Sequence, residues 1–193
     1  MGKIDHFDLI SPLYDLIFGR RIDHEIVEFA DVHDEDTLLD VGGGTGRVSV
    51  LFKSRVKNVF IADSSMNMLR EAQKKGLVTT NSNSEKLPFA DRSIDRIIIV
   101  DALHHVKNQK KTLAEMWRVL AEEGKIIIEE PDINNFFVKL IALGEKIMLM
   151  RSRFISPDRI VSIGNYASNG EVDIKRQNGI AWIIIQKTIS KSE

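Results

Sequence analysis

The residues of this chain that can do chemistry gather first around an acid followed by closely spaced glycines. Asp40 lies in the apolar run 38–41, and glycines follow at positions 42, 43, 44 and 46. An apolar strand that leads into a glycine loop and then a helix brings backbone N–H groups and the positive end of that helix to one point. Such a point suits a polar or anionic ligand, and we expect the ligand of this chain to bind there.

The spacing of the glycines separates the possible ligands. A nicotinamide dinucleotide site follows the pattern G-x-G-x-x-G, and counted from Gly42 its third glycine would fall on Arg47, which disfavours a nicotinamide oxidoreductase. The chain also lacks the G-K-[ST] sequence of a P-loop. A second acid, Asp63, ends the next apolar run. A carboxylate at such a strand end can accept two hydrogen bonds from a ribose diol.

The elements that must position these residues alternate along the chain. Short apolar runs predict strands, amphipathic stretches predict helices, and the sequence 177–179 (Gln-Asn-Gly) predicts a hairpin turn. This alternation predicts an α/β fold with a doubly wound, mostly parallel sheet and an antiparallel C-terminal hairpin. The predicted strands are 37–41, 59–62, 78–80, 94–100, 125–129, 171–176 and 180–187, and the predicted helices are 22–32, 46–55, 66–75, 108–120, 134–150 and 158–163.

Composition limits the class of protein. The 193 residues suffice for one domain, 1–193, and the formal net charge of -1 gives no global field that would attract nucleic acid. With no cysteine, disulfides and thiolate metal sites are excluded, and no H-E-x-x-H spacing is present, so we expect no metal site. The N-terminus lacks the apolar core of a signal peptide, and no uncharged apolar run reaches the roughly 20 residues of a membrane span. We expect a cytoplasmic protein.

Several motifs in order along residues 7–132 resemble one enzyme family. The acid and alternating glycines from Asp40 to Gly46 resemble the first motif of the class I S-adenosylmethionine-dependent methyltransferases, which are Rossmann-like. The segments 83–95, 101–106 and 115–125, with the opening 7–15, are similar to the ubiquinone and menaquinone biosynthesis C-methyltransferases of the methyltransferase type 11 group. The resemblance implies S-adenosyl-L-methionine as cofactor and S-adenosyl-L-homocysteine as product.

The resemblance also implies roles for particular residues. The glycines would approach the methionine part and the ribose, Asp63 would bind the ribose hydroxyls, and Asp40 would orient the loop or the cofactor's amino group. Asn83 stands where the family usually has Asp, and its amide oxygen can still accept from the adenine amino group. Tyr14 would close over the cofactor, or would only pack one helix on another. The cofactor-binding residues implied are Asp40, Gly42, Gly43, Gly44, Asp63, Ser64, Met68, Asn83, Ser84 and Tyr14.

The acceptor side carries fewer signals. His105, just past the strand 94–100, is a candidate general base with a pKa near neutrality, although a structural role for it is favoured. The acids Glu129, Glu130 and Asp132 are expected to form a solvated strand end. The segment 134–163 is a predicted helical insertion over the acceptor side, lining an apolar pocket, forming a dimer contact or capping the core. Residues 1–21 are a predicted helical lid.

These observations predict methyl transfer from S-adenosylmethionine to a small, apolar or aromatic metabolite. One alternative is a non-catalytic module that binds S-adenosylmethionine or S-adenosylhomocysteine. A nucleic-acid or protein methyltransferase is a further alternative, which the absence of a basic tract disfavours. The expected partner is a small-molecule acceptor rather than nucleic acid, and a homodimer is possible.

Overall fold

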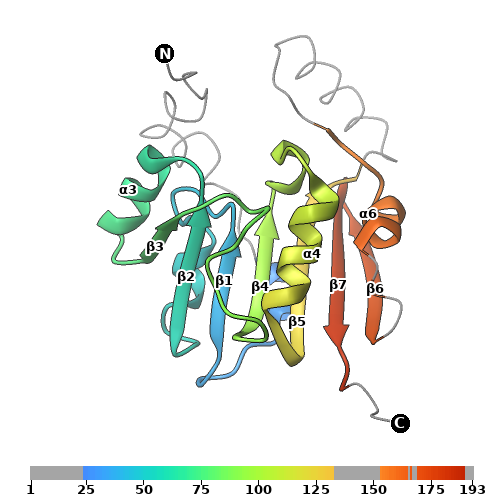
Figure 1. Ribbon diagram of the computed structural model, residues 1–193, viewed down its shortest axis with the longest axis horizontal. Helices are drawn as coiled ribbons and strands as arrows, with labels where there is room; N and C mark the ends of the chain where they lie inside the picture. The colour runs from blue at the N-terminus through green and yellow to red at the C-terminus, as the bar shows by residue number, and fades with distance from the viewer. Residues whose placement is uncertain (1–23, 133–152, 165, 167–168, 190–193) are drawn as a thin grey trace.

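The computed structural model describes residues 24–132, 153–164, 166 and 169–189 (Figure 1). Its centre is a seven-stranded sheet of order β3-β2-β1-β4-β5-β7-β6, in which β1 to β5 are parallel and β7 is antiparallel to both of its neighbours. The predicted fold class is therefore confirmed. The strands are β1 (Thr37–Val41), β2 (Asn58–Asp63), β3 (Val78–Asn81), β4 (Ile94–Val100), β5 (Leu120–Pro131), β6 (Gly170–Gln177) and β7 (Ile180–Lys187).

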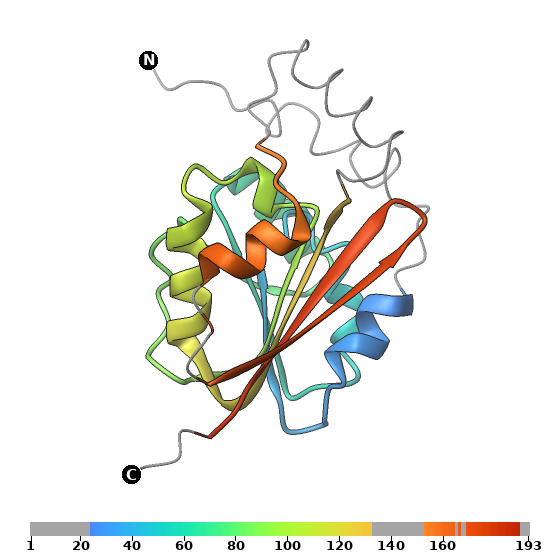
Figure 2. The same cartoon turned by 90° about the vertical axis from the view of Figure 1, so that its right-hand side faces the viewer.

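Helices cover both faces of this sheet (Figure 2). On one face, Phe52 and Leu69 pack with Ile98 of β4, and on the other face Leu113 packs with Ile97. Successive side chains of a strand point to opposite faces, so the isoleucine run of β4 supplies both cores. The helices are α2 (His24–Ala30), α3 (Met66–Lys74), α4 (Gln109–Val119) and α6 (Pro157–Gly164), and the 3-10 turns are η1 (Ser49–Phe52) and η2 (Leu103–His105).

The segment after the glycine loop differs from the prediction. The sequence predicts a helix over 46–55, but the structure has only the short turn η1 there. Gly46 has a left-handed φ of 74°, and the β-branched Val48 and Val50 are poor helix formers. The hydroxyl of Ser49 also donates to Asp40 at 2.5 Å instead of facing solvent. These local preferences outweigh the apolar periodicity that predicted the helix.

The fifth strand is longer than the predicted strand 125–129. Leu120 already pairs with Ile94, and the register then shifts so that Lys125 pairs with Arg96. The intervening residues form an irregular part of β5, where Glu123 has a φ of 59°. The predicted lid 1–21, with Tyr14, and the predicted helix 134–150 lie outside the described residues; of the predicted insertion 134–163, the structure describes residues 153–163.

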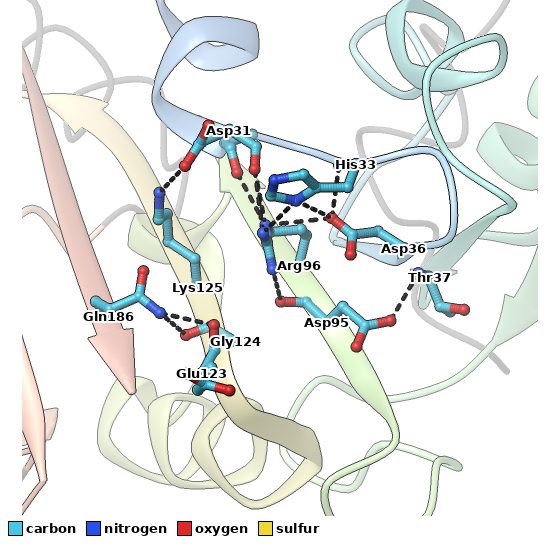
Figure 3. Close-up of polar contacts among 11 residues, drawn as sticks. Asp31, His33, Asp36, Thr37, Asp95, Arg96, Glu123, Gly124, Lys125 and Gln186 are labelled. Carbon is cyan, nitrogen blue, oxygen red and sulfur yellow. Dashed lines mark hydrogen bonds and ion pairs between the residues drawn. The ribbon is translucent and has the colours of Figure 1, made fainter. Parts of the chain in front are cut away.

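A buried arginine, Arg96, lies toward the edge of the sheet at which β1, β4 and β5 begin (Figure 3). The guanidinium of Arg96 donates to the carbonyls of Asp31 and Asp95 at 3.0–3.2 Å and lies 3.4 Å from a carboxylate oxygen of Asp36. Lys125 pairs with the Asp31 carboxylate at 3.0 Å and, chiefly through that hydrogen bond, lowers its pKa. These groups satisfy one another, so this cluster fastens α2 to the sheet.

Candidate functional site

The candidate residues meet at the opposite edge, where the parallel strands end. The glycine loop follows β1, Asp63 ends β2, the turn 101–105 follows β4, and Glu130 lies near the end of β5. Because β1, β2, β4 and β5 are parallel neighbours, their carboxyl ends lie side by side (Figure 1). This is the position at which open α/β sheets bind their ligands.

Two glycines of the loop make room for neighbouring side chains. A Cβ on Gly42 would lie 2.8 Å from the Cβ of Ala102, in the turn after β4. A Cβ on Gly43 would lie 2.5 Å from the Cγ of Asp40. The loop is further fixed by hydrogen bonds from the Gly42 N–H to the Ala62 carbonyl at 2.7 Å and within the loop itself. Gly42 and Gly43 therefore let the loop lie tightly on the turn after β4 and on the Asp40 carboxyl.

Gly44 and Gly46 both have left-handed φ angles, of 53° and 74°, but different surroundings. A Cβ on Gly46 would lie 2.3 Å from a methyl group of Leu77, so Gly46 is required for packing. Among the residues that the structure describes, a Cβ on Gly44 would have no atom closer than 4.0 Å, the nearest being Asp63 Oδ2 and Met68 Sδ. Gly44 thus exposes bare backbone to open space beside a carboxylate, as a site for close approach of a ligand requires.

Asp63 is held rigidly against this open space. Its Oδ2 accepts from the Gly44 N–H at 3.0 Å, and its Oδ1 accepts from the Ser65 N–H at 2.8 Å. Asn81 of β3 donates to the Asp63 carbonyl at 3.1 Å and secures the backbone. The carboxylate is half-buried, and a carboxylate oxygen can accept more than one hydrogen bond. It can therefore accept additional hydrogen bonds from a ligand at Gly44 without moving.

Asp40 lies beneath the loop instead of on its surface. Its side chain is 2% exposed, and the Ser49 hydroxyl donates to Oδ2 at 2.5 Å. Burial, with a smaller contribution from the charge of Asp63, raises the pKa of Asp40 to about 7. Among the described residues, no group forms a hydrogen bond with Asp40 Oδ1. The site therefore holds a second carboxyl that can gain a proton or a counter-charge near neutral pH.

The residues expected around an adenine come from the start of α3 and from the loop that follows β3. Ser65, rather than Ser64, caps α3 by accepting from the Met68 N–H at 3.2 Å, and the Met68 side chain is buried against the loop. Asn83 Oδ1 accepts from the Glu85 N–H at 2.9 Å, which fixes the amide in a local turn. The Ser84 hydroxyl bonds to Thr112 of α4 at 3.0 Å, so its side chain faces the helix.

A buried hydrogen bond between His104 and Glu130 organises the turn after β4. His104 Nδ1 lies 2.5 Å from Glu130 Oε2, and the Leu103 N–H donates to Glu130 Oε1 at 2.7 Å. The His104 ring stacks on Phe154, with centroids 4.3 Å apart, and its other neighbour is the His105 ring at 3.9 Å. Glu130 thus ties two consecutive residues of the turn to the end of β5.

Two expectations about the acceptor side are wrong. Glu129, Glu130 and Asp132 are buried, at 1%, 4% and 6% exposed, and do not form a solvated strand end. Glu129 accepts from the Trp182 indole at 2.6 Å, and Glu130 holds the turn. The pKa of His105 is not near neutrality, because burial, and to a smaller extent the charge of His104, lowers it to about 3. A neutral His105 at physiological pH can accept a hydrogen bond but is a weak base.

Two absences hold for the part of the chain that the structure describes. No group of three or more His, Asp or Glu side chains there is arranged to hold a metal ion. No helix in that part is long and apolar enough to cross a membrane.

A known domain family matches the segment that carries this geometry. Residues 39–128, from the glycine loop to β5, match the family described as "Methyltransferase domain". This segment is therefore similar to a methyltransferase domain. The ubiquinone/menaquinone biosynthesis C-methyltransferase UbiE of Xanthomonas oryzae pv. oryzae is 35% identical over an alignment of 136 positions, and the match covers 65% of this chain and 54% of that protein. The demethylmenaquinone methyltransferase of Thermobifida fusca is 31% identical over an alignment of 133 positions, and the match covers 65% of this chain and 56% of that protein.

Solved methyltransferase structures share the fold of this domain. A Thermotoga maritima protein described as a SAM-dependent methyltransferase and possible histamine N-methyltransferase superposes with a TM-score of 0.78. It is 19% identical, and the match covers 94% of this chain and 100% of that one. At this identity the likeness concerns the fold. This chain spans about half the length of its UbiE relative.

Proposed function

We propose that this chain is an S-adenosylmethionine-dependent methyltransferase that acts on a small, apolar or aromatic metabolite. One observation carries the proposal: Gly44 presents open backbone directly beside the Asp63 carboxylate, which two backbone N–H groups hold in place. The methyltransferase domain match over residues 39–128 starts at this loop and supports the same conclusion.

The charges at the site fit a cationic cofactor better than a phosphate. Asp40 and Asp63 are both acids, and they flank Gly43 and Gly44 from below and from the side. Sites for phosphates instead surround the ligand with backbone N–H groups and a lysine. A cofactor that carries an ammonium and a sulfonium group, and no phosphate, would lower the cost of ionising the buried Asp40. The residues present therefore fit S-adenosylmethionine.

We propose a role toward this cofactor for each candidate residue that the structure describes. Asp63 would accept from the ribose hydroxyls, and Gly42, Gly43 and Gly44 would allow the backbone to approach. Met68 and Ser64 would line the adenine pocket, with Asn83 and the backbone of Ser84 at the adenine edge. Tyr14 stays a prediction. The bound cofactor supplies an electrophilic methyl group for in-line transfer, so the protein's task is alignment and exclusion of water.

His105 would act by hydrogen bonding. Its low pKa keeps the imidazole neutral, and its ring packs against His104, which Glu130 anchors. A neutral imidazole can accept a hydrogen bond from a hydroxyl on the acceptor and so orient it. The acceptor class rests on the relatives, which are a ubiquinone/menaquinone biosynthesis C-methyltransferase and a demethylmenaquinone methyltransferase. Cytoplasmic localisation and a homodimer remain predictions.

The test of the proposal is methyl transfer from a labelled donor. The chain is incubated with methyl-labelled S-adenosylmethionine and a panel of phenols, quinols and aromatic amines, and the product mass is measured. We expect a product one methyl group heavier with at least one apolar aromatic acceptor, and at least a tenfold slower reaction for Asp63→Asn. Asp34→Asn, on an exposed loop, is the matched control and should react at the parent rate. Cofactor binding without turnover of any acceptor would favour the non-catalytic binding module instead.

A further inference from the structure

The charge of this chain is distributed unevenly over the fold. Residues 47–78 contain seven Lys and Arg but only two Asp and Glu, a formal charge of +5, although the whole chain carries -1. Of the two acids, Asp63 belongs to the glycine-loop site and Glu71 pairs with Lys74 at 2.6 Å. This segment runs from the glycine loop through β2 and α3 into β3, at one end of the sheet (Figure 1). That end of an otherwise acidic molecule is basic.

The edge strand at this basic end lacks the usual protection. Within the part of the chain that the structure describes, no strand pairs with the outer edge of β3. Its sequence, Val-Thr-Thr-Asn, has no charge and no proline, and Val78 is 58% exposed. The opposite edge strand, β6, carries Glu171, Asp173, Lys175 and Arg176. Exposed strand edges normally carry such charges because bare edges pair with other chains.

A small hollow lies next to the start of β3. It has a volume of about 180 Å³, and its lining includes Val59 and Leu77 with the exposed Val78. This is below the roughly 300–1,000 Å³ of small-molecule pockets, so it suits one side chain. Lys53 and Lys57 also line it; they bond to the Lys75 carbonyl at 2.8 Å and to Glu35 at 2.7 Å. Both are exposed contacts, which contribute little and can be exchanged for others.

We propose that the β3 edge and this hollow bind an extended acidic segment of a partner protein. The segment would add a strand to β3 through main-chain hydrogen bonds, place one apolar side chain in the hollow, and set Asp or Glu beside Lys53 and Lys57. A second copy of this chain fits poorly, because it would bring two basic ends together. The hollow is at the amino ends of β2 and β3, whereas Gly44 and Asp63 are at the carboxyl ends. The two sites are therefore separate.

The proposal is tested with a dye-labelled peptide of alternating Asp and Val with a central Leu, and with the same peptide carrying Lys for Asp. We expect saturable anisotropy for the acidic peptide alone, weakening as salt rises, and at least tenfold slower amide exchange over 78–81 when it is bound. The Lys53→Glu/Lys57→Glu variant should bind at least tenfold more weakly. The control Lys110→Glu/Lys111→Glu, on exposed positions of α4, should bind within twofold of the parent. Binding of S-adenosylhomocysteine should be the same in the parent and in both double variants.

Several results would overturn the proposal. Equal binding of both peptides, no saturation at millimolar peptide, or undiminished binding by Lys53→Glu/Lys57→Glu would each contradict it. Concentration-dependent dimerisation that protects 78–81 would assign the edge to a second copy. Amide protection of 78–81 that is present without peptide and is lost on deleting residues 1–23 would assign the edge to this chain's own N-terminal segment. Saturable binding of a labelled single-stranded oligonucleotide, without binding of the acidic peptide, would assign the basic end to nucleic acid.

Discussion

The proton on Asp40 should control both the stability of the fold and the affinity for a cationic cofactor. Burial raises the pKa of this carboxyl from 3.8 to about 7. Between these values the folded protein binds more protons than the unfolded chain, so the unfolding free energy falls as pH rises through this window. From pH 5 to pH 7 the decrease due to Asp40 is about 2 kcal/mol, from 1.36 kcal/mol for each pH unit, less near the pKa itself.

Cofactor affinity should change in the opposite direction. The ionised fraction of Asp40 rises from about 1% at pH 5 to about 50% at pH 7, given its pKa of about 7. A cofactor whose positive charge favours the ionised form should therefore bind up to about 50-fold more tightly at pH 7 than at pH 5. S-adenosylmethionine, with its additional sulfonium charge, should show a steeper dependence than S-adenosylhomocysteine.

Asp40→Asn removes the titration while preserving the shape of the side chain. The unfolding free energy is measured by urea denaturation and tryptophan fluorescence at pH 5 and pH 7, and cofactor affinity by titration calorimetry. The variant should lose about 2 kcal/mol of the parent's pH-dependent change and most of the pH dependence of binding. The exposed Asp34→Asn should retain both. An Asp40→Asn protein with the parent's pH dependence in both measurements would refute the account of this carboxyl.

Three further predictions concern the neighbouring residues. Gly46→Ala places a Cβ 2.3 Å from Leu77 at a left-handed φ and should lower the unfolding free energy by about 3 kcal/mol in urea denaturation; a loss below 1 kcal/mol would contradict the packing role. Glu130→Ala removes the carboxylate that accepts from His104 and from the Leu103 N–H, and it should lower the unfolding free energy by about 3–5 kcal/mol. The exposed Glu171→Ala should lower it by about 0.5 kcal/mol. At subsaturating S-adenosylmethionine, a limb near pH 7 in the pH–rate profile should persist in His105→Asn and disappear in Asp40→Asn, because the pKa of His105 is about 3; the reverse pattern would restore His105 as the titrating base.

The strands were predictable because their signals are local. The apolar run of β4 and the alternation with helices determine a parallel sheet, and the Asn178–Gly179 turn marks the hairpin. The prediction of a helix over 46–55 was wrong because Gly46 has a left-handed φ and Val48 and Val50 are β-branched, while the Ser49 hydroxyl makes a tertiary contact with Asp40. Periodicity contains no information on that contact.

The position of the site could be predicted from the sequence, but the role of each residue within it could not. Spacing grouped the four glycines together, whereas the structure distinguishes Gly46, which packs on Leu77, from Gly44, which faces open space. Likewise, Glu130 resembles any acid at a strand end until its distance to His104 is known. The burial that moves the pKa of His105 and Asp40 arises from residues far apart in the sequence, so only the folded chain reveals it.

We propose that the open face of Gly44 beside Asp63 holds the adenosyl cofactor. Titration calorimetry of S-adenosylhomocysteine into the parent and into Gly44→Ala measures this binding. In the described part of the chain, a Cβ on Gly44 would lie no closer than 4.0 Å to another atom, so the variant should fold with a cost of about 1–2 kcal/mol for its left-handed φ. We expect one saturable site for S-adenosylhomocysteine in the parent, and we expect Gly44→Ala to bind it at least tenfold more weakly. Equal affinity in the two folded proteins would contradict it.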